Sequence, residues 1–214
     1  MKCLLSFQAR NVAVCVQFRD SDQEGTAPLK CIYGKPGETL FTTSACAAVL
    51  HHNQNPEIYG EVNIELPVHV HEKHHILFTF YHISCEISTK TSTKKREGVQ
   101  SLVGYSWAPL LKDGRMQSIE LQLPVSATLP PGYLYDKIQD AKKPAPDIKW
   151  VENSKPLFKV KTNVASTIYP QVCLLPSNIK TTCESYCNKH HKTSVFCISL
   201  SRICTSTSSS STAS

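Results

Sequence analysis

The nine residues His75–Ile83, HILFTFYHI, give the clearest indication of the fold of this chain. Apart from its two histidines, the stretch contains only β-branched, aromatic and aliphatic residues. It has no alanine, glutamate or lysine to favour a helix. Its positions are apolar in succession, without alternation, which is typical of a central strand covered on both faces. The stretch therefore predicts a buried β-strand.

The five residues that lead into this strand and include its first position, His75, read HEKHH. They satisfy the H-E-x-x-H pattern of zinc proteases, with His71 and His75 as metal ligands and Glu72 as the base. The pattern needs a helix, because only there do residues four apart share one face. In extended chain the two histidines would lie about 13 Å apart, and Glu72 would point to the other side. A zinc hydrolase is therefore a remote alternative, and a polar turn that leads into a strand is the preferred interpretation.

Further strand patterns follow the same rule of short apolar or alternating runs between turn residues. Val12, Val14, Val16 and Phe18 alternate with Ala13, Cys15 and Gln17, and an Asp-Gly turn lies in KDGR. The other expected strands are LKCIY, EVNIELP, LVGYSWAPLL, IELQLPV, PLFKVKTNVASTIY and, more weakly because of its alanines, FTTSACAAVL. Many short strands with glycine and proline between them predict an all-β, antiparallel β-sandwich.

Length and charge set bounds on the function. A chain of 214 residues with a formal net charge of +6 fits one domain with an appendage. The segment from Gln171 onward carries +3, from four bases and one acid, so the body is only mildly basic and bulk nucleic-acid binding is not indicated. No run is long enough to span a membrane, and MKCLLSF is too short for a signal peptide, so we infer an intracellular protein.

The ten cysteines fall into two groups. Those of the body are scattered singly, Cys15 and Cys31 within apolar runs, and we expect them to behave as small buried hydrophobes in a reducing compartment. The other five crowd into the segment 170–214, where CESYCNKHH imitates a zinc knuckle without a compact fold around it. That segment ends in TSTSSSSTAS, and we predict that it is a disordered, low-complexity tail.

Several long strings carry a resemblance to a known family: ARNVAVCVQFRDSD, PLKCIYGKPG, VLHHNQNPEIY, IELPVHVHEKHHILFTFYHISC, VGYSWAPLLKDGR and PVSATLPPGYL. They resemble DOCK homology region 1, a C2-like domain, of the zizimin subfamily of the DOCK (dedicator of cytokinesis) family. The resemblance runs from about residue 9 to residue 169, which leaves 1–8 as a non-family segment. Upstream the family has a further strand, so we expect an edge strand to be missing. Downstream the pattern breaks after STIY, which suggests a truncated or alternatively spliced product.

The resemblance implies a function that is not enzymatic in this chain. DOCK proteins are guanine-nucleotide exchange factors for Rho-family GTPases, and exchange is carried by a separate homology region 2, which nothing here matches. Homology region 1 is a membrane-targeting module in the family, in some members through phosphoinositides. The resemblance thus implies a cytoplasmic module recruited peripherally to membranes, with no cofactor. Its expected partners are an anionic lipid, other regions of an exchange factor or a regulator and, indirectly, Rho-family GTPases.

A calcium site is the first one to test on a C2-like chain, because many such domains gather loop aspartates around Ca²⁺. Only Asp20 and Asp22 offer carboxylates here, and His82 and Ser84 stand where calcium-dependent members have acids. Calcium needs six to eight oxygen ligands, so no metal site is predicted.

The segment KTSTKKRE is the better candidate site, since Lys90, Lys94, Lys95 and Arg96 place four cations within seven residues. These side chains suit the phosphates of an anionic headgroup, and Lys30 and Lys35 would join them if the loops gather at one end of the sandwich. A solvated loop without a ligand, and a protein-docking module of the same exchange factor, are the alternatives.

Overall fold

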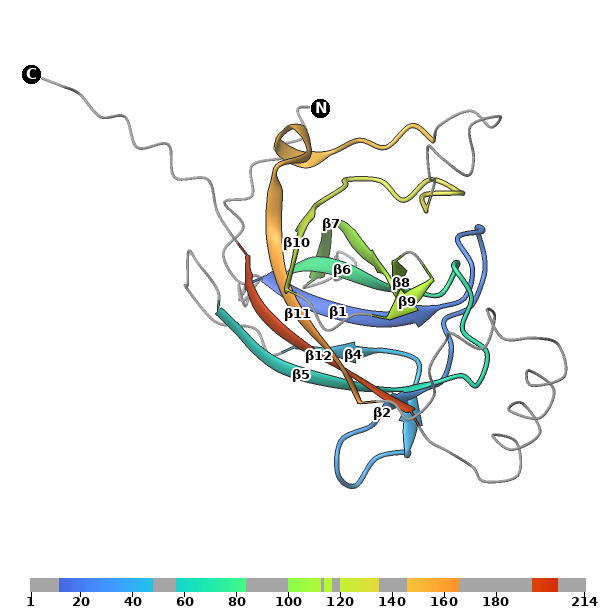
Figure 1. Ribbon diagram of the computed structural model, residues 1–214. Helices are drawn as coiled ribbons and strands as arrows, with labels where there is room; N and C mark the ends of the chain where they lie inside the picture. The colour runs from blue at the N-terminus through green and yellow to red at the C-terminus, as the bar shows by residue number, and fades with distance from the viewer. Residues whose placement is uncertain are drawn as a thin grey trace, which may run out of the picture.

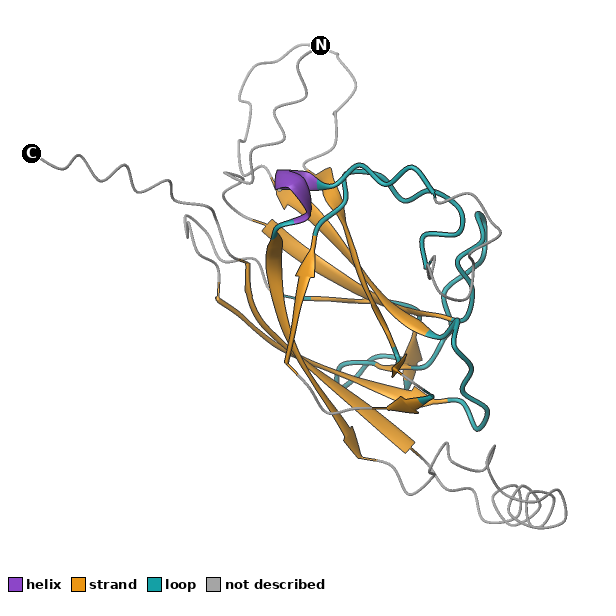
Figure 2. Cartoon of the chain, turned by 45° about the horizontal axis from the view of Figure 1, so that its top comes forward, coloured by secondary structure: helices purple, strands orange, loops and turns teal. Residues whose placement is uncertain are grey.

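The computed structural model describes residues 12–47, 57–83, 100–112, 114–116, 120–134, 146–165 and 194–203. These residues form two antiparallel β-sheets that face one another, as Figures 1 and 2 show. The predicted all-β, C2-like antiparallel sandwich is confirmed. Its one helical element is a short 3-10 turn, Val151–Ser154, among the described residues.

Sheet A has four strands in the order β4, β1, β6, β7. Their bounds are β4 Ala45–Cys46, β1 Val12–Arg19, β6 His75–Ile83 and β7 Gln100–Pro109. The predicted central strand is β6, which pairs with β1 on one side and β7 on the other. Both faces of its first six residues are buried, which explains the unbroken apolar run.

Sheet B has six strands in the order β10, β11, β12, β5, β2, β3. Their bounds are β10 Glu120–Pro124, β11 Pro156–Ala165, β12 Ser194–Ile203, β5 Glu57–Leu66, β2 Ile32–Tyr33 and β3 Phe41–Thr42. A two-stranded hairpin, β8 Leu111–Lys112 with β9 Arg115–Met116, lies at the predicted Asp-Gly turn. Gly114 in this turn has φ of 70°, a conformation that glycine adopts without strain.

The weak strand expected in FTTSACAAVL is two separate strands. β3 pairs with β2 in sheet B, whereas β4 pairs with β1 in sheet A, so the chain crosses from one sheet to the other between Thr42 and Ala45. The Thr42 hydroxyl donates a hydrogen bond to the Ser44 carbonyl at this corner (3.1 Å). This bond gives the Ser44 carbonyl a hydrogen-bond partner where the chain leaves one sheet for the other.

The expectation of a disordered tail over 170–214 is wrong for residues 194–203. They form β12, which lies between β11 and β5 in the middle of sheet B (Figure 1). Ile198 and Leu200 are buried in the core, while Cys197 and Ser199 face outward beside Glu61. The period-two pattern of SVFCISLSRI was hidden by its serines and by the cysteine-rich surroundings.

The core lies between the sheets and is built on the inward faces of β1, β6, β5, β11 and β12. Phe158 of β11 contacts both Phe78 and Phe80 of β6 edge to face, at centroid distances of 4.9 and 5.1 Å. Because these aromatic rings come from opposite sheets, they hold the two layers together.

The outer faces of the two sheets differ. On sheet A, Trp107 packs against Tyr133 and Trp150, which come from the connection between β10 and β11 (centroids 5.1 and 5.4 Å). On sheet B, the outward residues Glu61, Lys161 and Ser199 are exposed. The connection thus covers part of sheet A, and the corresponding face of sheet B meets solvent.

Candidate functional site

The four cations of the predicted lipid site, Lys90, Lys94, Lys95 and Arg96, lie outside the described residues. The strand residues that bracket this segment are described: Ile83 at the end of β6 pairs with Gln100 at the start of β7. The same end of sheet A holds Val12, which pairs with His82. The basic segment therefore leaves sheet A and re-enters it at the Val12 end.

Lys30 and Lys35 are both exposed, on either side of β2. Leu29, next to Lys30, donates its amide to the carbonyl of Phe18 (2.9 Å), near the other end of β1. Phe18 is paired with Ile76 at the beginning of β6, so about 20 Å of strand separates this end from Ile83. Lys30 thus lies at the opposite end of sheet A from the point where the basic segment is anchored.

The zinc-hydrolase alternative fails on the geometry of HEKHH. His71 and Glu72 are exposed on the turn before β6, whereas His75 is fully buried at the first position of the strand. His75 Nδ1 lies 2.7 Å from the Lys73 carbonyl, and His75 Nε2 lies 2.5 Å from the Tyr133 hydroxyl. Both ring nitrogens are engaged, which leaves neither free for a metal. No group of three metal-ligating side chains occurs among the residues that the structure describes.

The two contacts also define the protonation state of His75. A carbonyl only accepts, so Nδ1 carries the proton and Nε2 accepts from the Tyr133 hydroxyl. Burial lowers the pKa of His75 to about 4 and raises the pKa of Tyr133 to about 12, so both groups are neutral near pH 7. The pair joins β6 to the connection that covers sheet A.

Of the two carboxylates considered for calcium, that of Asp22 is engaged by a lysine. Asp22 is buried and forms an ion pair with Lys73 (2.9 Å), and its carbonyl accepts the amide of Gly132 (3.0 Å). This network ties the loop after β1 to the turn before β6 and to the connection near Tyr133. The Asp22 carboxylate is therefore paired with the Lys73 ammonium group, which occupies the place a cation would need.

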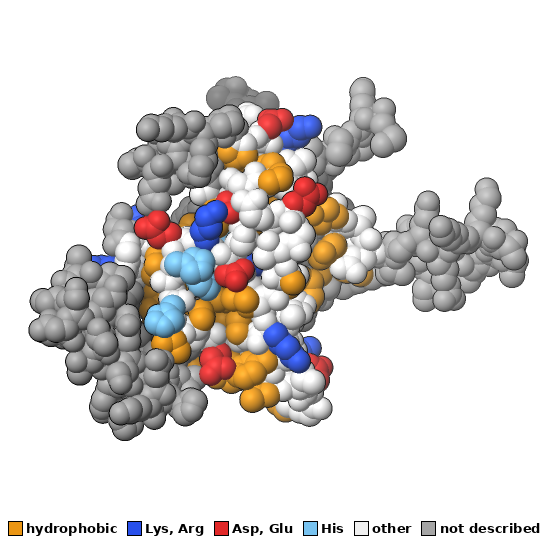
Figure 3. All heavy atoms as spheres, turned by 90° about the vertical axis from the view of Figure 1, so that its right-hand side faces the viewer, with side chains coloured by type: hydrophobic (Ala, Val, Ile, Leu, Met, Phe, Trp, Pro, Cys, Tyr) orange, Lys and Arg blue, Asp and Glu red, His pale blue; other side chains and the backbone are white. Residues whose placement is uncertain are grey.

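The end of the sandwich that holds the loop after β1 and the turn before β6 carries charges of both signs, among them Asp22, Glu72 and Lys73. Figure 3 shows described histidine, acidic and basic side chains interspersed with hydrophobic ones on this face, and the described side chains form no continuous basic patch in this view. An anionic membrane surface is attracted by clustered positive charge. The charges of the described side chains therefore do not mark this end as the membrane-facing one.

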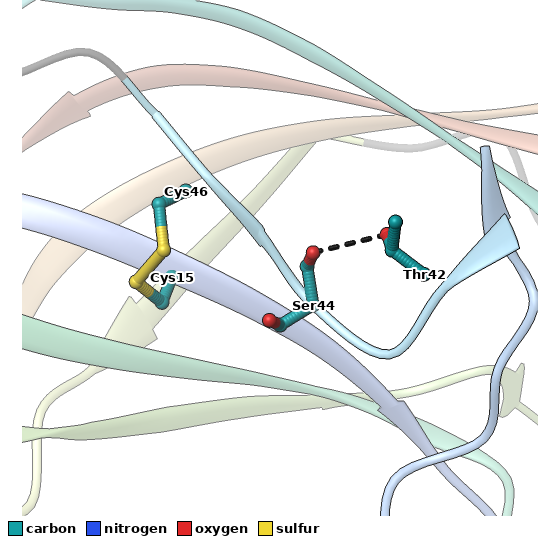
Figure 4. The surroundings of a disulfide bond; sticks show 4 residues. All are labelled: Cys15, Thr42, Ser44 and Cys46. Atoms are coloured by element: carbon teal, nitrogen blue, oxygen red, sulfur yellow. Dashed lines mark hydrogen bonds between the residues drawn. A yellow bond between two sulfur atoms is a disulfide. The ribbon is translucent and has the colours of Figure 1, made fainter. Parts of the chain in front are cut away.

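The cysteines of β1 and β4 correct a prediction. Cys15 and Cys46 form a disulfide instead of acting as small separate hydrophobes (Figure 4). They are directly opposed in the antiparallel pairing of β1 and β4, with Cα atoms 4.1 Å apart. The two cysteines are 31 positions apart in the sequence, and only the register of the two strands brings their thiols together. The pairing could therefore not be predicted from the local sequence.

A shallow polar cleft on the outer face of sheet B was not predicted. It is lined by Glu61, Glu120, Lys161, Thr162, Asn163, Cys197 and Ser199, from β5, β10, β11 and β12. Glu120 forms an ion pair with Lys159 (2.5 Å), and Cys197 Sγ donates to Glu61 Oε1 (3.1 Å). Burial, with Glu61 beside it, raises the pKa of the Cys197 thiol to about 11, so this cysteine is not a nucleophile near pH 7.

The mixture of acidic and basic side chains in the cleft suits a protein surface better than a purely anionic headgroup.

The described part of the chain contains no helix that is long and apolar enough to cross a bilayer.

Comparison with known proteins shows which family this chain resembles. A family model described as the C2 domain in Dock180 and Zizimin proteins matches residues 3–172. Dedicator of cytokinesis protein 11 of Danio rerio is 74% identical over 164 residues, which is 77% of this chain and 8% of that protein.

Dedicator of cytokinesis protein 9 of Homo sapiens is 58% identical over 165 residues, 77% of this chain and 8% of that protein. Protein 7 of Mus musculus is 36% identical over 163 residues, 76% of this chain and 7% of that protein. The chain thus spans less than a tenth of the length of these relatives.

Proposed function

The chain belongs to the family of C2 domains of Dock180 and Zizimin proteins, and from this we propose that it is a non-catalytic membrane-targeting module of a DOCK-family exchange factor for Rho-family GTPases. The proposal places it in the cytoplasm, peripherally recruited to membranes that display phosphoinositides. The proposal assigns catalysis of nucleotide exchange to parts of a DOCK protein other than the region that this chain covers, which is 8% of the Danio rerio relative.

The observation that carries the proposal is the density of positive charge between β6 and β7. Lys90, Lys94, Lys95 and Arg96 follow one another within seven residues, on a segment whose two ends meet at the Ile83–Gln100 pair. Each basic residue near an anionic leaflet contributes about 1 kcal/mol, so four supply several kcal/mol of salt-sensitive attraction. That is enough for recruitment alongside a second anchor, and not for permanent attachment.

Lys30 and Lys35 belong to the proposal as a separate group. Both are exposed, and Leu40 in the turn between β2 and β3 is 69% exposed beside them. Because Lys30 lies at the other end of sheet A, a flat membrane that contacts the basic segment at its anchor does not reach Lys30 in the same orientation. Their substitution therefore tests which end of the sandwich faces the lipid.

The test is co-sedimentation of the full chain with phosphatidylcholine vesicles, with and without phosphatidylinositol trisphosphate, across a salt series. We expect binding that requires the phosphoinositide and weakens as salt rises. Reversal of charge at Lys90, Lys94, Lys95 and Arg96 to glutamate should abolish it. Reversal of four cations elsewhere, Lys112, Arg115, Lys149 and Lys155, changes the net charge equally and should leave most of the binding.

Equal loss in both fourfold variants would reduce the interaction to net charge and remove the basic segment as a site. Loss in a Lys30→Glu, Lys35→Glu double variant, with binding retained in the fourfold variant, would move the membrane contact to the β2 end.

A second candidate function, protein docking within the exchange factor, is favoured by the cleft on sheet B. Its Glu61, Glu120 and Lys161 offer charges of both signs on an exposed sheet face. Docking predicts that a folded chain fails to bind vesicles but binds other regions of a DOCK protein. A Glu61→Lys, Lys161→Glu variant should weaken that binding, whereas the basic-segment variant should not.

A further inference from the structure

β12 occupies an unusual position for a segment so late in the chain. It pairs with β11 from Ala165↔Val195 to Phe158↔Ile203, and with β5 from Ser194↔Leu66 to Arg202↔Glu57. Both pairings are antiparallel and extend along the whole strand. β12 is therefore a central strand that joins two parts of sheet B, β10 with β11 and β5 with β2 and β3.

The family match ends at residue 172, before β12 begins, and it includes both of the strands that flank β12. The matched region thus supplies two walls, and residues from outside it supply the strand between them. Because β5 and β11 each run antiparallel to β12, they run parallel to one another. With β12 removed, their facing backbone edges would be about 9.6 Å apart, twice the spacing of paired strands, and neither could satisfy the other.

The space between the walls has a definite chemical pattern. On the core side, Ile198 lies between Val62 and Thr162, and Leu200 lies between Gly60 and Val160. All but Gly60 are buried. Leu200 Cδ1 packs over Gly60, where an added Cβ would lie 3.6 Å from it, in ordinary van der Waals contact.

On the solvent side, the same space takes small and polar groups. Cys197 lies between Asn63 and Asn163, and its thiol donates a hydrogen bond to Glu61. Ser199 lies between Glu61 and Lys161. A segment that fits must therefore be extended, with aliphatic residues at alternate positions on one side and small polar residues on the other.

We propose that the space between β5 and β11 is a strand-binding site, which this chain fills with its own residues 194–203 as a guest strand. The ligand class is an extended peptide of alternating aliphatic and small polar residues. Main-chain hydrogen bonds to both walls provide the affinity, and the pockets for Ile198 and Leu200 provide the register. The assignment is independent of lipid binding, which involves other residues.

The test uses the full chain with a recognition sequence for a site-specific protease placed between residues 170 and 190. Cleavage of the folded protein separates β12 covalently from the rest of the chain. We expect the C-terminal fragment to remain bound on size exclusion and in native mass spectrometry, at the mass of one chain. Hydrogen exchange at Val62 and Ile64 should remain as slow as in the uncut protein.

Specificity is then tested by exchange of the strand. The cut protein is unfolded in urea without reductant and refolded with an excess of fluorescein-labelled peptide 194–203, in which Cys197→Ser prevents mixed disulfides. We expect the labelled peptide to be incorporated. A peptide with Ile198→Asp should bind at least about tenfold more weakly, because a carboxylate would enter the core.

The matched control is a peptide with aspartate at the next position, Ser199→Asp. This side chain points to solvent between Glu61 and Lys161, so we expect incorporation within about threefold of the native peptide. Equal binding of the two aspartate peptides would overturn the assignment. So would release of the fragment on cleavage with unchanged exchange at Val62, or a cut protein that has twice the mass of one chain.

Discussion

The central strands of sheet A and sheet B differ in what covers their outer faces. The central strand of sheet A, β6, is buried on both faces, by the core on one side and by the connection that carries Tyr133 on the other. The central strand of sheet B, β12, is buried on the core side and open on the other, where Ser199 and the cleft lie.

A strand's position in a sheet and its hydrophobicity are therefore separate properties. β6 and β12 each have two hydrogen-bonded neighbours, yet β6 begins with six successive buried residues, whereas in β12 the exposed Ser199 lies between the buried Ile198 and Leu200. What covers the outer face, and not the number of neighbouring strands, decides how apolar the sequence is. The following measurements test how far β12 matches β6 as a structural strand.

The largest effect is expected for Phe78→Ala in β6. Phe78 is fully buried and its ring packs edge to face on Phe158 of sheet B, so truncation opens a cavity between the sheets. We expect a loss of about 3 to 5 kcal/mol in the free energy of unfolding. Urea denaturation followed by tryptophan fluorescence measures it, and a loss below about 1 kcal/mol would mean that this contact does not join the layers.

Removal of the disulfide comes next, because it crosslinks sheet A and has no counterpart in the described part of sheet B. The bond between Cys15 and Cys46 closes a loop of 31 residues, for which chain entropy predicts about 3 to 4 kcal/mol. A double Cys→Ser variant should lose that stability, whereas Cys31→Ser, which removes a free thiol, should lose much less. Rapid alkylation of both Cys15 and Cys46 in the folded protein would show that the bond is absent.

Ile198→Ala compares β12 with β6 directly. Ile198 is fully buried between β5 and β11, and we expect a loss of about 3 kcal/mol, in the middle of the range for such truncations. Ser199→Ala, the adjacent exposed position, should change stability by no more than about 0.5 kcal/mol. Indistinguishable effects of the two variants in urea denaturation would mean that β12 contributes nothing to the core.

The smallest effect concerns pH and the His75–Tyr133 pair. An unfolded histidine has a pKa near 6.5, and burial lowers the pKa of His75 to about 4. As pH falls through this interval, the unfolded chain takes up a proton that the folded protein excludes, so stability is present above pH 6.5 and is lost toward pH 4. Between pH 7 and pH 5 the expected loss is about 2 kcal/mol.

Thermal unfolding of the protein and of His75→Gln, recorded from pH 7 to pH 5, measures this loss. The variant is less stable at pH 7 because the Tyr133 hydroxyl loses its partner, but its stability should fall less with pH. Burial also lowers the pKa of His74, which accounts for the slope that remains. Parallel curves for the two proteins would contradict a buried neutral His75.

Much of the fold was predictable because its strongest signals are local. A few neighbouring residues are enough to indicate the apolar strand β6, the alternating strand β1 with Val12, Val14 and Val16, and the turn at Gly114. The resemblance to the DOCK family then gave the arrangement of these pieces. β12 was missed because Cys197 and Ser199 on its open face made the segment look like part of a low-complexity tail.

The contacts of the candidate sites were less predictable because they depend on pairing between distant residues. His75 and Tyr133 are 58 positions apart, and Asp22 and Lys73 are 51 apart. Nothing in either local sequence indicates the partner. The expectation that the cysteines stay reduced failed for a related reason, since it considered single positions and not the register that opposes Cys15 to Cys46.

The place of β12 in sheet B also affects how fast the protein can fold. Cys197 and Glu61, neighbours in the finished sheet, are 136 positions apart in the chain, so their pairing closes one of the longest loops available. Contacts of such high sequence separation cost chain entropy before they return any stability, and folding slows accordingly. Until β12 docks, β5 and β11 present two open edges to other chains, and this interval is when aggregation would compete with folding.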